Sequence, residues 1–168
     1  MTLESLLEHT LMNPSGPHKK HLSLPMPTKQ DYERYTGGHT PRKWTLVGES
    51  WRCPSCGRTK FEQLTWTKSR TGGIYIWLAP IVEHHDHSAD NYRQTVIARK
   101  PRFAPTLICF DCNIAEGRLK RMLKLPGNFS FSPTELNAII TGYPHRRVTE
   151  DLEMARLIAY AALQLHFQ

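Results

Sequence analysis

Apolar positions recur with the 3.6-residue period of a helix at both ends of the chain. Residues 3–11 place leucines on one face and glutamates on the other, which predicts a short amphipathic helix. Residues 13–27 contain four prolines and predict an extended arm. Residues 149–166 predict a last helix with a broad apolar face of leucine, isoleucine and alanine. That face could close the core or form the interface of a homodimer.

The middle of the chain has the β-branched and aromatic character of strands. Residues 28–37 predict one or two helical turns, and a short strand and a turn are expected from Trp44 onwards. Residues 61–69 and 72–85 then predict two strands joined by a glycine-rich turn. Residues 88–105 are polar and basic, and predict a long loop with one candidate strand near its centre.

A strand that turns directly into a helix is predicted over residues 106–125, with Asp111 as the helix cap. The expected buried stripe of this helix consists of Ile114, Leu119, Met122 and Leu123. Ser132 and Glu135 match a capping box, which predicts a helix from Pro133 to about Thr141.

These elements predict an α+β fold in three parts. Residues 1–43 form an N-terminal helix and arm, residues 44–126 a central core, and residues 127–168 a C-terminal helical extension. The net charge of +7 and the pI of about 9.4 favour an anionic partner, for which DNA is the first expectation. A merely basic surface is the alternative. The longest apolar run has nine residues, which is too short for a membrane span, and the N-terminus does not resemble a signal peptide. We therefore expect a cytoplasmic protein of a bacterium or of a phage-infected host cell.

All four cysteines lie in two CxxC pairs, Cys53 with Cys56 and Cys109 with Cys112. A two-residue spacing lets a tight turn direct both sulfurs at one ion, and two such knuckles complete a closed tetrahedral zinc site. Reduced cytoplasm favours a metal over disulfides. The sequence thus predicts a structural zinc. A redox role for the CxxC pairs is the alternative, and finding zinc bound to intact thiols would exclude it.

Three histidines and an aspartate follow an apolar run in the stretch "IVEHHDH", residues 81–87, between the two knuckles. The order CxxC, "HHDH", "LICFDCN" over residues 51–124 resembles the HNH (ββα-metal) endonucleases, and especially the recombination endonuclease VII type of phages. The resemblance implies a ββα-metal nuclease core and metal-dependent hydrolysis of DNA phosphodiester bonds, by nicking or cleavage. The longer gap between the motifs indicates an insertion at residues 88–105.

The resemblance also assigns roles to individual residues. It implies that His84 and Asn113 bind the catalytic cation and that His85 is the general base, with Glu116 where some relatives carry a further glutamate. Histidine suits a base at neutral pH, and an amide oxygen suits Mg²⁺. An imidazole at position 84, where the relatives usually have aspartate, favours Mn²⁺. In a shifted register, Asp86 would be the ligand and His87 the base.

Basic residues gather between positions 93 and 124, and they are the expected phosphate contacts if DNA binds there. The candidates are Arg99, Lys100, Arg102, Arg118, Lys120, Arg121 and Lys124. The alternative for each is a solvated side chain. The runner-up function for the whole chain is a non-catalytic, zinc-dependent nucleic-acid-binding or regulatory protein.

Overall fold

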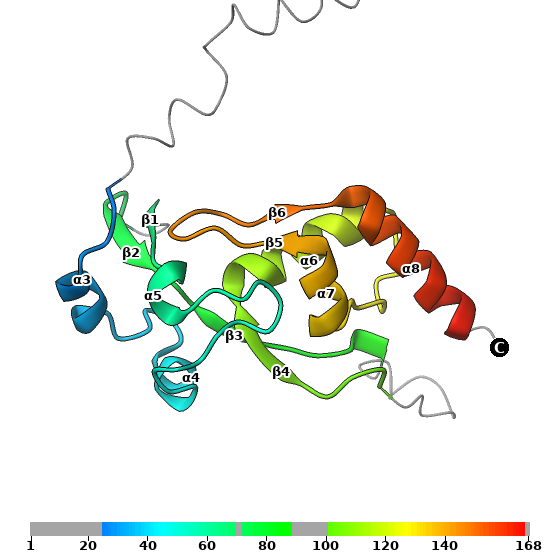
Figure 1. The fold of residues 1–168 in the computed structure, drawn as a ribbon, viewed down its shortest axis with the longest axis horizontal. Helices are drawn as coiled ribbons and strands as arrows, with labels where there is room; N and C mark the ends of the chain where they lie inside the picture. Colours follow the sequence, from blue (N-terminus) through cyan, green and yellow to red (C-terminus); the bar gives the residue numbers. More distant parts are fainter. Residues whose placement is uncertain (1–24, 70–71, 89–100, 167–168) are drawn as a thin grey trace, which may run out of the picture.

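The computed structural model describes residues 25–69, 72–88 and 101–166 (Figure 1). The predicted helix over residues 3–11 and most of the arm lie outside these ranges, as do Arg99 and Lys100. The described residues form helices and three separate two-stranded antiparallel sheets, so the α+β class is confirmed. In chain order the elements are α3 (Lys29–Arg34), α4 (Pro41–Leu46), α5 (Lys60–Gln63), β1 (Thr65–Lys68), β2 (Tyr75–Leu78), β3 (Ile81–His84), β4 (Thr106–Cys109), α6 (Phe110–Met122), α7 (Pro133–Ile139), β5 (Ile140–Thr141), β6 (Thr149–Glu150) and α8 (Leu152–His166).

The strand predicted from Trp44 is wrong, because residues Pro41–Leu46 form helix α4. Pro41 suits the first helical turn, where its missing N–H costs nothing. Trp44 is buried in this helix, edge-on to Tyr35 with 4.8 Å between ring centroids. Gly37 allows this packing, because its φ is +93° and a Cβ there would lie 2.5 Å from the Cβ of Trp44.

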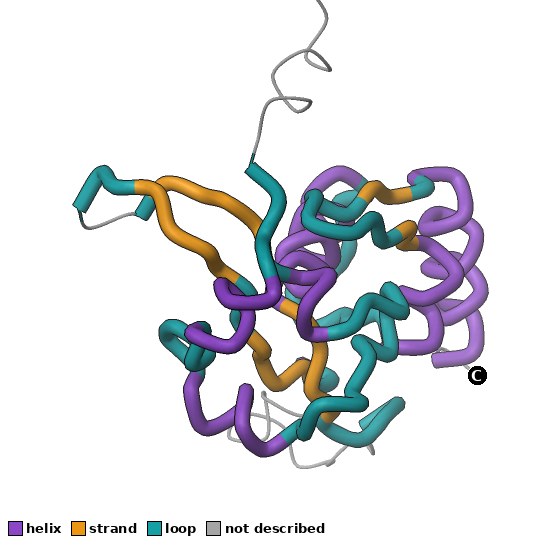
Figure 2. The backbone as a smooth tube through the Cα atoms, turned by 60° about the vertical axis from the view of Figure 1, so that its left-hand side comes forward, coloured by secondary structure: helices purple, strands orange, loops and turns teal. Residues whose placement is uncertain are grey.

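The long apolar run at residues 72–85 divides into two strands that belong to different sheets. β2 pairs with β1, and β3 pairs with β4, so the chain changes partners at Ala79–Pro80. Proline has no N–H for a continuing ladder, which favours a break at this point. The β1–β2 hairpin projects from the rest of the molecule in Figure 2. Residues 61–69 also differ from the expected single strand, because a Thr59–Glu62 capping box starts the short helix α5 first.

The predicted strand-to-helix transition is confirmed by β4 and α6, which follow each other without a gap. Two details of the prediction are wrong. The N-cap is Cys109, whereas Asp111 lies inside the first turn and points its carboxylate at arginines. The buried face consists of Cys112, Ala115, Glu116 and Leu119, and Met122 is 56% exposed. Because Cys112 must turn toward the cysteine cluster, the buried face of α6 includes Cys112. The spacing of the apolar side chains alone therefore predicted the wrong face of the helix.

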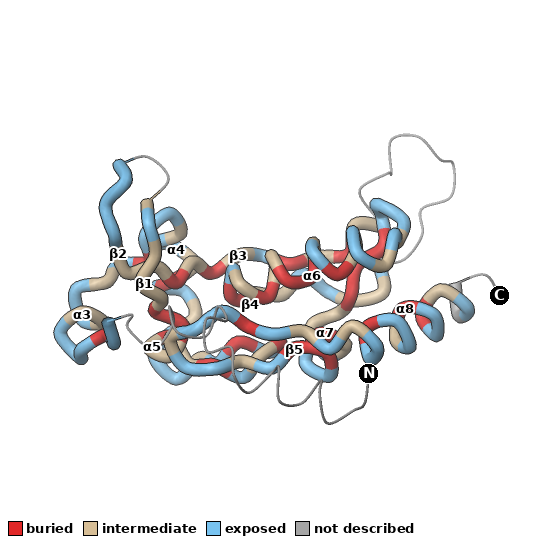
Figure 3. The backbone as a smooth tube through the Cα atoms, turned by 90° about the horizontal axis from the view of Figure 1, so that it is seen from above, coloured by how far each residue is buried: buried red, intermediate tan, exposed pale blue. Residues whose placement is uncertain are grey.

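The C-terminal part begins with the predicted capping box, in which Ser132 accepts from the Glu135 N–H and the Glu135 carboxylate accepts from the Ser132 N–H. The helix α7 ends at Ile139, two residues earlier than expected, and leads into the β5–β6 hairpin and α8. In Figure 3, buried segments (red) recur along α6, α7 and α8 between exposed segments. One core includes Cys53, Leu119, Phe131 and Ala159, so the C-terminal helices and the knuckles share it. A second core surrounds Trp44 and Leu64. None of the described helices is long and apolar enough to cross a bilayer.

Candidate functional site

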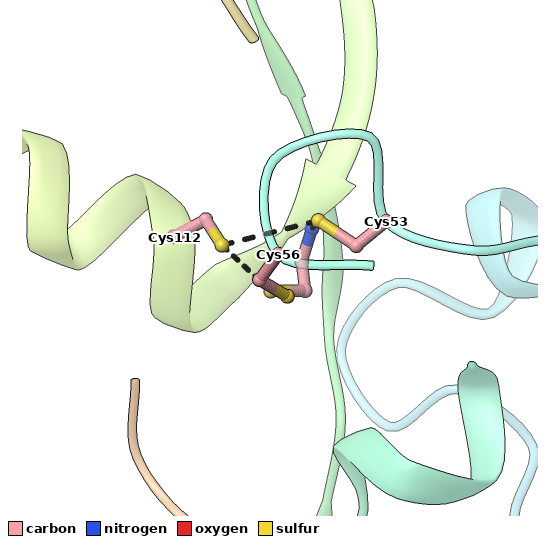
Figure 4. Close-up of side chains that lie close together, drawn as sticks. Cys53, Cys56 and Cys112 are labelled. Atoms are coloured by element: carbon pink, nitrogen blue, oxygen red, sulfur yellow. Dashed lines mark hydrogen bonds between the residues drawn. The ribbon is translucent and has the colours of Figure 1, made fainter. Parts of the chain in front are cut away.

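The four cysteine sulfurs converge at the junction of the first knuckle, the end of β4 and the first turn of α6. Their Sγ atoms all lie within 4.8 Å of one another, including 3.9 Å for Cys53–Cys112, 3.7 Å for Cys56–Cys109 and 3.3 Å for Cys109–Cys112. Figure 4 shows Cys53, Cys56 and Cys112 directed at one point. Zn–S bonds of about 2.3 Å in a tetrahedron place sulfurs about 3.8 Å apart. The donor set and its spacing therefore fit one zinc-like ion.

Local backbone structure aims these sulfurs. In the first knuckle the Gly57 N–H donates to the Cys53 carbonyl at 2.8 Å, and Gly57 has a φ of +71° that a glycine adopts without strain. The Cys109 N–H points at the Cys53 sulfur at 3.3 Å, as second-sphere donors do in thiolate metal sites. Cys112 follows one helical turn after Cys109, so α6 itself supplies the second knuckle.

A buried arginine, Arg58, lies against the sulfurs. It is 3% exposed, and its guanidinium donates to the sulfurs of Cys56 at 3.3 Å and Cys109 at 3.4 Å. It also donates to the Asp111 carboxylate at 3.1 Å, which binds Arg147 at the same distance. Burial disfavours the charge of Arg58, but the negative sulfurs of Cys109 and Cys56 and then Asp111 outweigh it and raise its pKa. A permanent cation therefore offsets part of the negative charge of four thiolates.

Hydrogen bonding among the four thiols lowers the pKa of Cys53 and Cys56 and raises the pKa of Cys109 and Cys112. Hydrogen bonds from Cys109 and then Cys112 lower the pKa of Cys56 far below the ordinary thiol value, and Arg58 acts in the same direction. Four thiolates this close repel one another unless a cation lies among them. The chemistry of the cluster thus agrees with its geometry, and both fit the binding of one metal ion such as zinc by the four sulfurs.

The β5–β6 hairpin closes over the first knuckle. Arg58 donates to the Arg146 carbonyl at 2.7 Å. Gly142 packs so closely that a Cβ there would lie 2.7 Å from the Cys56 carbonyl oxygen. These contacts come from a segment more than 80 residues after Cys56 in the sequence. Neither Arg58 nor Gly142 was among the predicted site residues, since no spacing rule links them to the cysteines.

His84 is the last residue of β3 and is 2% exposed. Its Nε2 lies 2.6 Å from the Phe131 carbonyl, and its ring stacks on Phe103. Because a carbonyl oxygen only accepts, Nε2 carries the hydrogen. In the neutral ring Nδ1 then keeps a lone pair, which is the arrangement that metal-bound histidines show when a carbonyl fixes the other nitrogen.

The rest of the "HHDH" stretch leaves the strand. The rings of His85 and His87 lie 4.6 Å apart between centroids, and both are partly exposed. The Asp86 carboxylate is buried and accepts from the Ser88 N–H, the Ser88 hydroxyl and the Arg102 N–H. Burial raises the pKa of Asp86, but the bonds from Arg102 and then Ser88 outweigh it and lower the pKa overall. Asp86 thus anchors the loop that follows β3, in addition to any role as a ligand.

Asn113 and Glu116 lie on α6, which packs against both β3 and β4. Of the two residues, Glu116 is the more buried. It is buried, its Oε1 has no hydrogen bond in the structure, and Lys120 Nζ lies 3.8 Å away.

Among the described residues, the four cysteines are the one group of three or more His, Cys, Asp or Glu side chains that could share an ion. A cation held by one imidazole, a single carboxylate or amide, and water would not form such a group. The catalytic cation predicted at His84 and Asn113, with Asp86 and Glu116 as further ligands, therefore stays a prediction.

The basic candidates fall into two classes. Arg102 is mostly buried, and its guanidinium donates to the Ser130 carbonyl at 2.6 Å and to Glu135. Arg118 pairs with Glu150, and Lys120 donates to the Gly127 carbonyl at 3.2 Å. In contrast, Arg121 and Lys124 are exposed near the end of α6. The structure thus presents Arg121 and Lys124 to solvent and engages Arg102 within the fold, while phosphate contact by each stays a prediction.

Comparison with protein-family models, with curated proteins and with solved structures finds no match to this chain.

Proposed function

We propose that this protein is a metal-dependent endonuclease that hydrolyses DNA phosphodiester bonds. The observation that carries the proposal is the combination of a β-hairpin, a histidine cluster at the end of its first strand, and a helix that follows its second strand. β3 and β4 form an antiparallel hairpin, α6 follows β4 directly and packs on both strands, and "HHDH" begins at the last residue of β3. The four-cysteine cluster at the start of α6 fixes the helix relative to the hairpin. This arrangement supports the ββα-metal core that the resemblance to HNH endonucleases implies.

The side chains supply distinct parts of the chemistry. His85 is partly exposed directly after β3, and an imidazole there can take the proton of an attacking water at neutral pH. His84, with Nε2 donating to Phe131, offers Nδ1 for a cation. Glu116 offers a buried carboxylate oxygen without a hydrogen bond, and Asn113 an amide oxygen. A divalent cation, when bound, stabilises negative charge on the scissile phosphate and the leaving oxygen.

The test is cleavage of supercoiled plasmid with Mg²⁺ or Mn²⁺ by zinc-loaded protein. We expect nicking that EDTA abolishes during a short incubation in which the thiol-bound zinc is retained. His85→Ala should lower the rate by about 10²- to 10⁴-fold, and His87→Ala should lower it much less. If His87→Ala lowers the rate more than His85→Ala does, His87 is the general base. Equal cleavage by both variants and wild type would identify a contaminating nuclease and refute the proposal.

The second candidate is a zinc-dependent nucleic-acid-binding protein without catalytic activity. The observation in its favour is that His84 and Asp86 both have internal hydrogen-bond partners that account for their burial. Under this alternative, purified protein binds DNA in a salt-dependent way and leaves plasmid intact with every divalent cation tried.

A further inference from the structure

The β1–β2 hairpin separates its side chains into two chemically different faces. In its antiparallel register, Trp66 is opposite Trp77 and Lys68 is opposite Tyr75. Because side chains alternate along a strand, these four residues share one face, and threonines and aliphatic residues occupy the other. One face of the hairpin therefore consists of three aromatic rings and a lysine.

The aromatic rings form a continuous ladder across the two strands. Trp66 and Tyr75 are stacked with an interplanar angle of 17° and centroids 6.1 Å apart, and Trp66 and Trp77 are 4.8 Å apart. Tyr75 is 54% exposed and the neighbouring Ile74 is 65% exposed. Among the described residues, Trp66 packs against neither of the two cores, whereas Trp77 packs against the second. The outer part of the ladder thus covers no core.

The hairpin also has no third strand in the structure as described, and it projects from the body in Figure 2. A lone two-stranded hairpin is only marginally stable in water. Cross-strand aromatic pairs contribute some stability. They do not, however, account for the exposed ring of Tyr75 beside a lysine at the outer end of the hairpin.

We propose that this face, formed by Trp66, Lys68, Tyr75 and Trp77, binds a single-stranded nucleic-acid segment by stacking on its bases. Unpaired bases present flat π faces, and their phosphates are complementary to Lys68 and to a chain of net charge +7. A duplex hides its base faces and offers only the phosphates. The inference rests on the proposed function, to which it adds the substrate class: DNA with an unpaired segment near the scissile bond.

The position of the face relative to the histidines supports this substrate class. β2 continues through Ala79–Pro80 into β3, so Trp77 and His85 are eight residues apart in one extended stretch. That stretch spans at most about 28 Å. One nucleic-acid strand can therefore reach from the aromatic face to the proposed catalytic residues.

The experiment is a titration of tryptophan fluorescence with oligothymidylate and with a duplex of equal length. The protein is the full zinc-loaded chain carrying His85→Ala, in buffer without divalent cations. We expect quenching and tighter binding of the single strand. Trp66→Leu and Tyr75→Leu should each weaken its binding, measured by anisotropy of a labelled oligonucleotide, by about 5- to 150-fold. The matched control is Tyr143→Leu, which removes another exposed aromatic ring, on the β5–β6 hairpin; it should leave affinity unchanged.

Zinc content and thermal unfolding establish that each variant is folded, and the exposure of Tyr75 makes its substitution the safer of the two. Single-strand affinity that stays at the wild-type value in both variants would overturn the inference. A change in self-association by sedimentation without a change in affinity would do the same, and would make the face a protein contact. The titration measures binding alone, so its result can be compared with that of the separate plasmid-nicking assay. Plasmid nicking with normal binding by both variants removes only this inference, and Trp66-dependent binding without nicking removes only the proposed function.

Discussion

Replacing Arg58 with methionine tests the electrostatic description of the cysteine cluster most directly. Methionine keeps the unbranched aliphatic stem and removes the guanidinium. The wild-type group is 2% exposed by side chain and has four acceptors: the sulfurs of Cys56 and Cys109, the Asp111 carboxylate and the Arg146 carbonyl. Asp111 keeps its bond to Arg147 in the variant. The sulfurs and the Arg146 carbonyl lose theirs.

The magnitude follows from what the variant leaves behind. Removing one partner of a buried charge pair costs about 3–5 kcal/mol, because the other charge stays buried. Retention of the Asp111–Arg147 pair places the expected loss of unfolding free energy at the lower end, about 3 kcal/mol. Second-sphere changes at metal sites typically lower metal affinity by about 10- to 100-fold. Arg58→Lys should be intermediate, because an ammonium cannot span four acceptors.

The assay is competition for zinc by a chromophoric chelator, combined with thermal unfolding of the zinc-loaded protein. Arg52→Met is the matched control in the same knuckle. Its side chain is 64% exposed and donates to the Gly57 carbonyl at 3.2 Å, so the expected cost is within about 1 kcal/mol. If Arg58→Met holds zinc as tightly as wild type and unfolds at the same temperature, the charge argument for the cluster is refuted.

Three further changes test the surroundings of the site. Gly142→Ala should cost about 1–3 kcal/mol in chemical denaturation, because its Cβ meets the Cys56 carbonyl, whereas Gly127→Ala, with open space around its Cβ, should be neutral; equal effects would contradict the packing. Ser132→Ala should cost about 1 kcal/mol through loss of the α7 cap, and Ser132→Asp should restore it. Burial lowers the pKa of His145, so the unfolded chain binds more protons below pH about 6.5 and wild type should lose stability there as pH falls. His145→Asn, which suits the φ of +58°, should show a shallower slope between pH 7 and 5, and parallel curves would argue against this contribution.

The parts of the fold that short-range rules govern could be predicted from the sequence. The two CxxC pairs predicted one four-sulfur cluster, and the sulfurs do converge. Ser132 and Glu135 predicted the start of α7, because a capping box involves only the residues that form it. The passage from β4 into α6 was visible in the change of period near Cys109.

The errors arose where distant residues decide the local structure. Trp44 has the aromatic character of a strand residue, but it forms part of a helix because Tyr35 and Gly37 provide its packing site. Asp111 has the residue type of an N-cap, but α6 begins one residue before it, and the arginines at 58 and 147 bind its carboxylate. The role of Arg58 depends on burial by a hairpin far along the chain, and no local pattern encodes that burial.

The packing of Gly142 and the Arg146 carbonyl against the first knuckle has a consequence for biosynthesis. Domains generally fold as units while the ribosome extends the chain from its N-terminus. All four cysteines are synthesised before the segment that covers Arg58. A chain that lacks this segment can hold the metal only in a looser, more accessible state. Final tightening of the ion is therefore a late event in synthesis, and chains that terminate early should release zinc readily to cellular chelators.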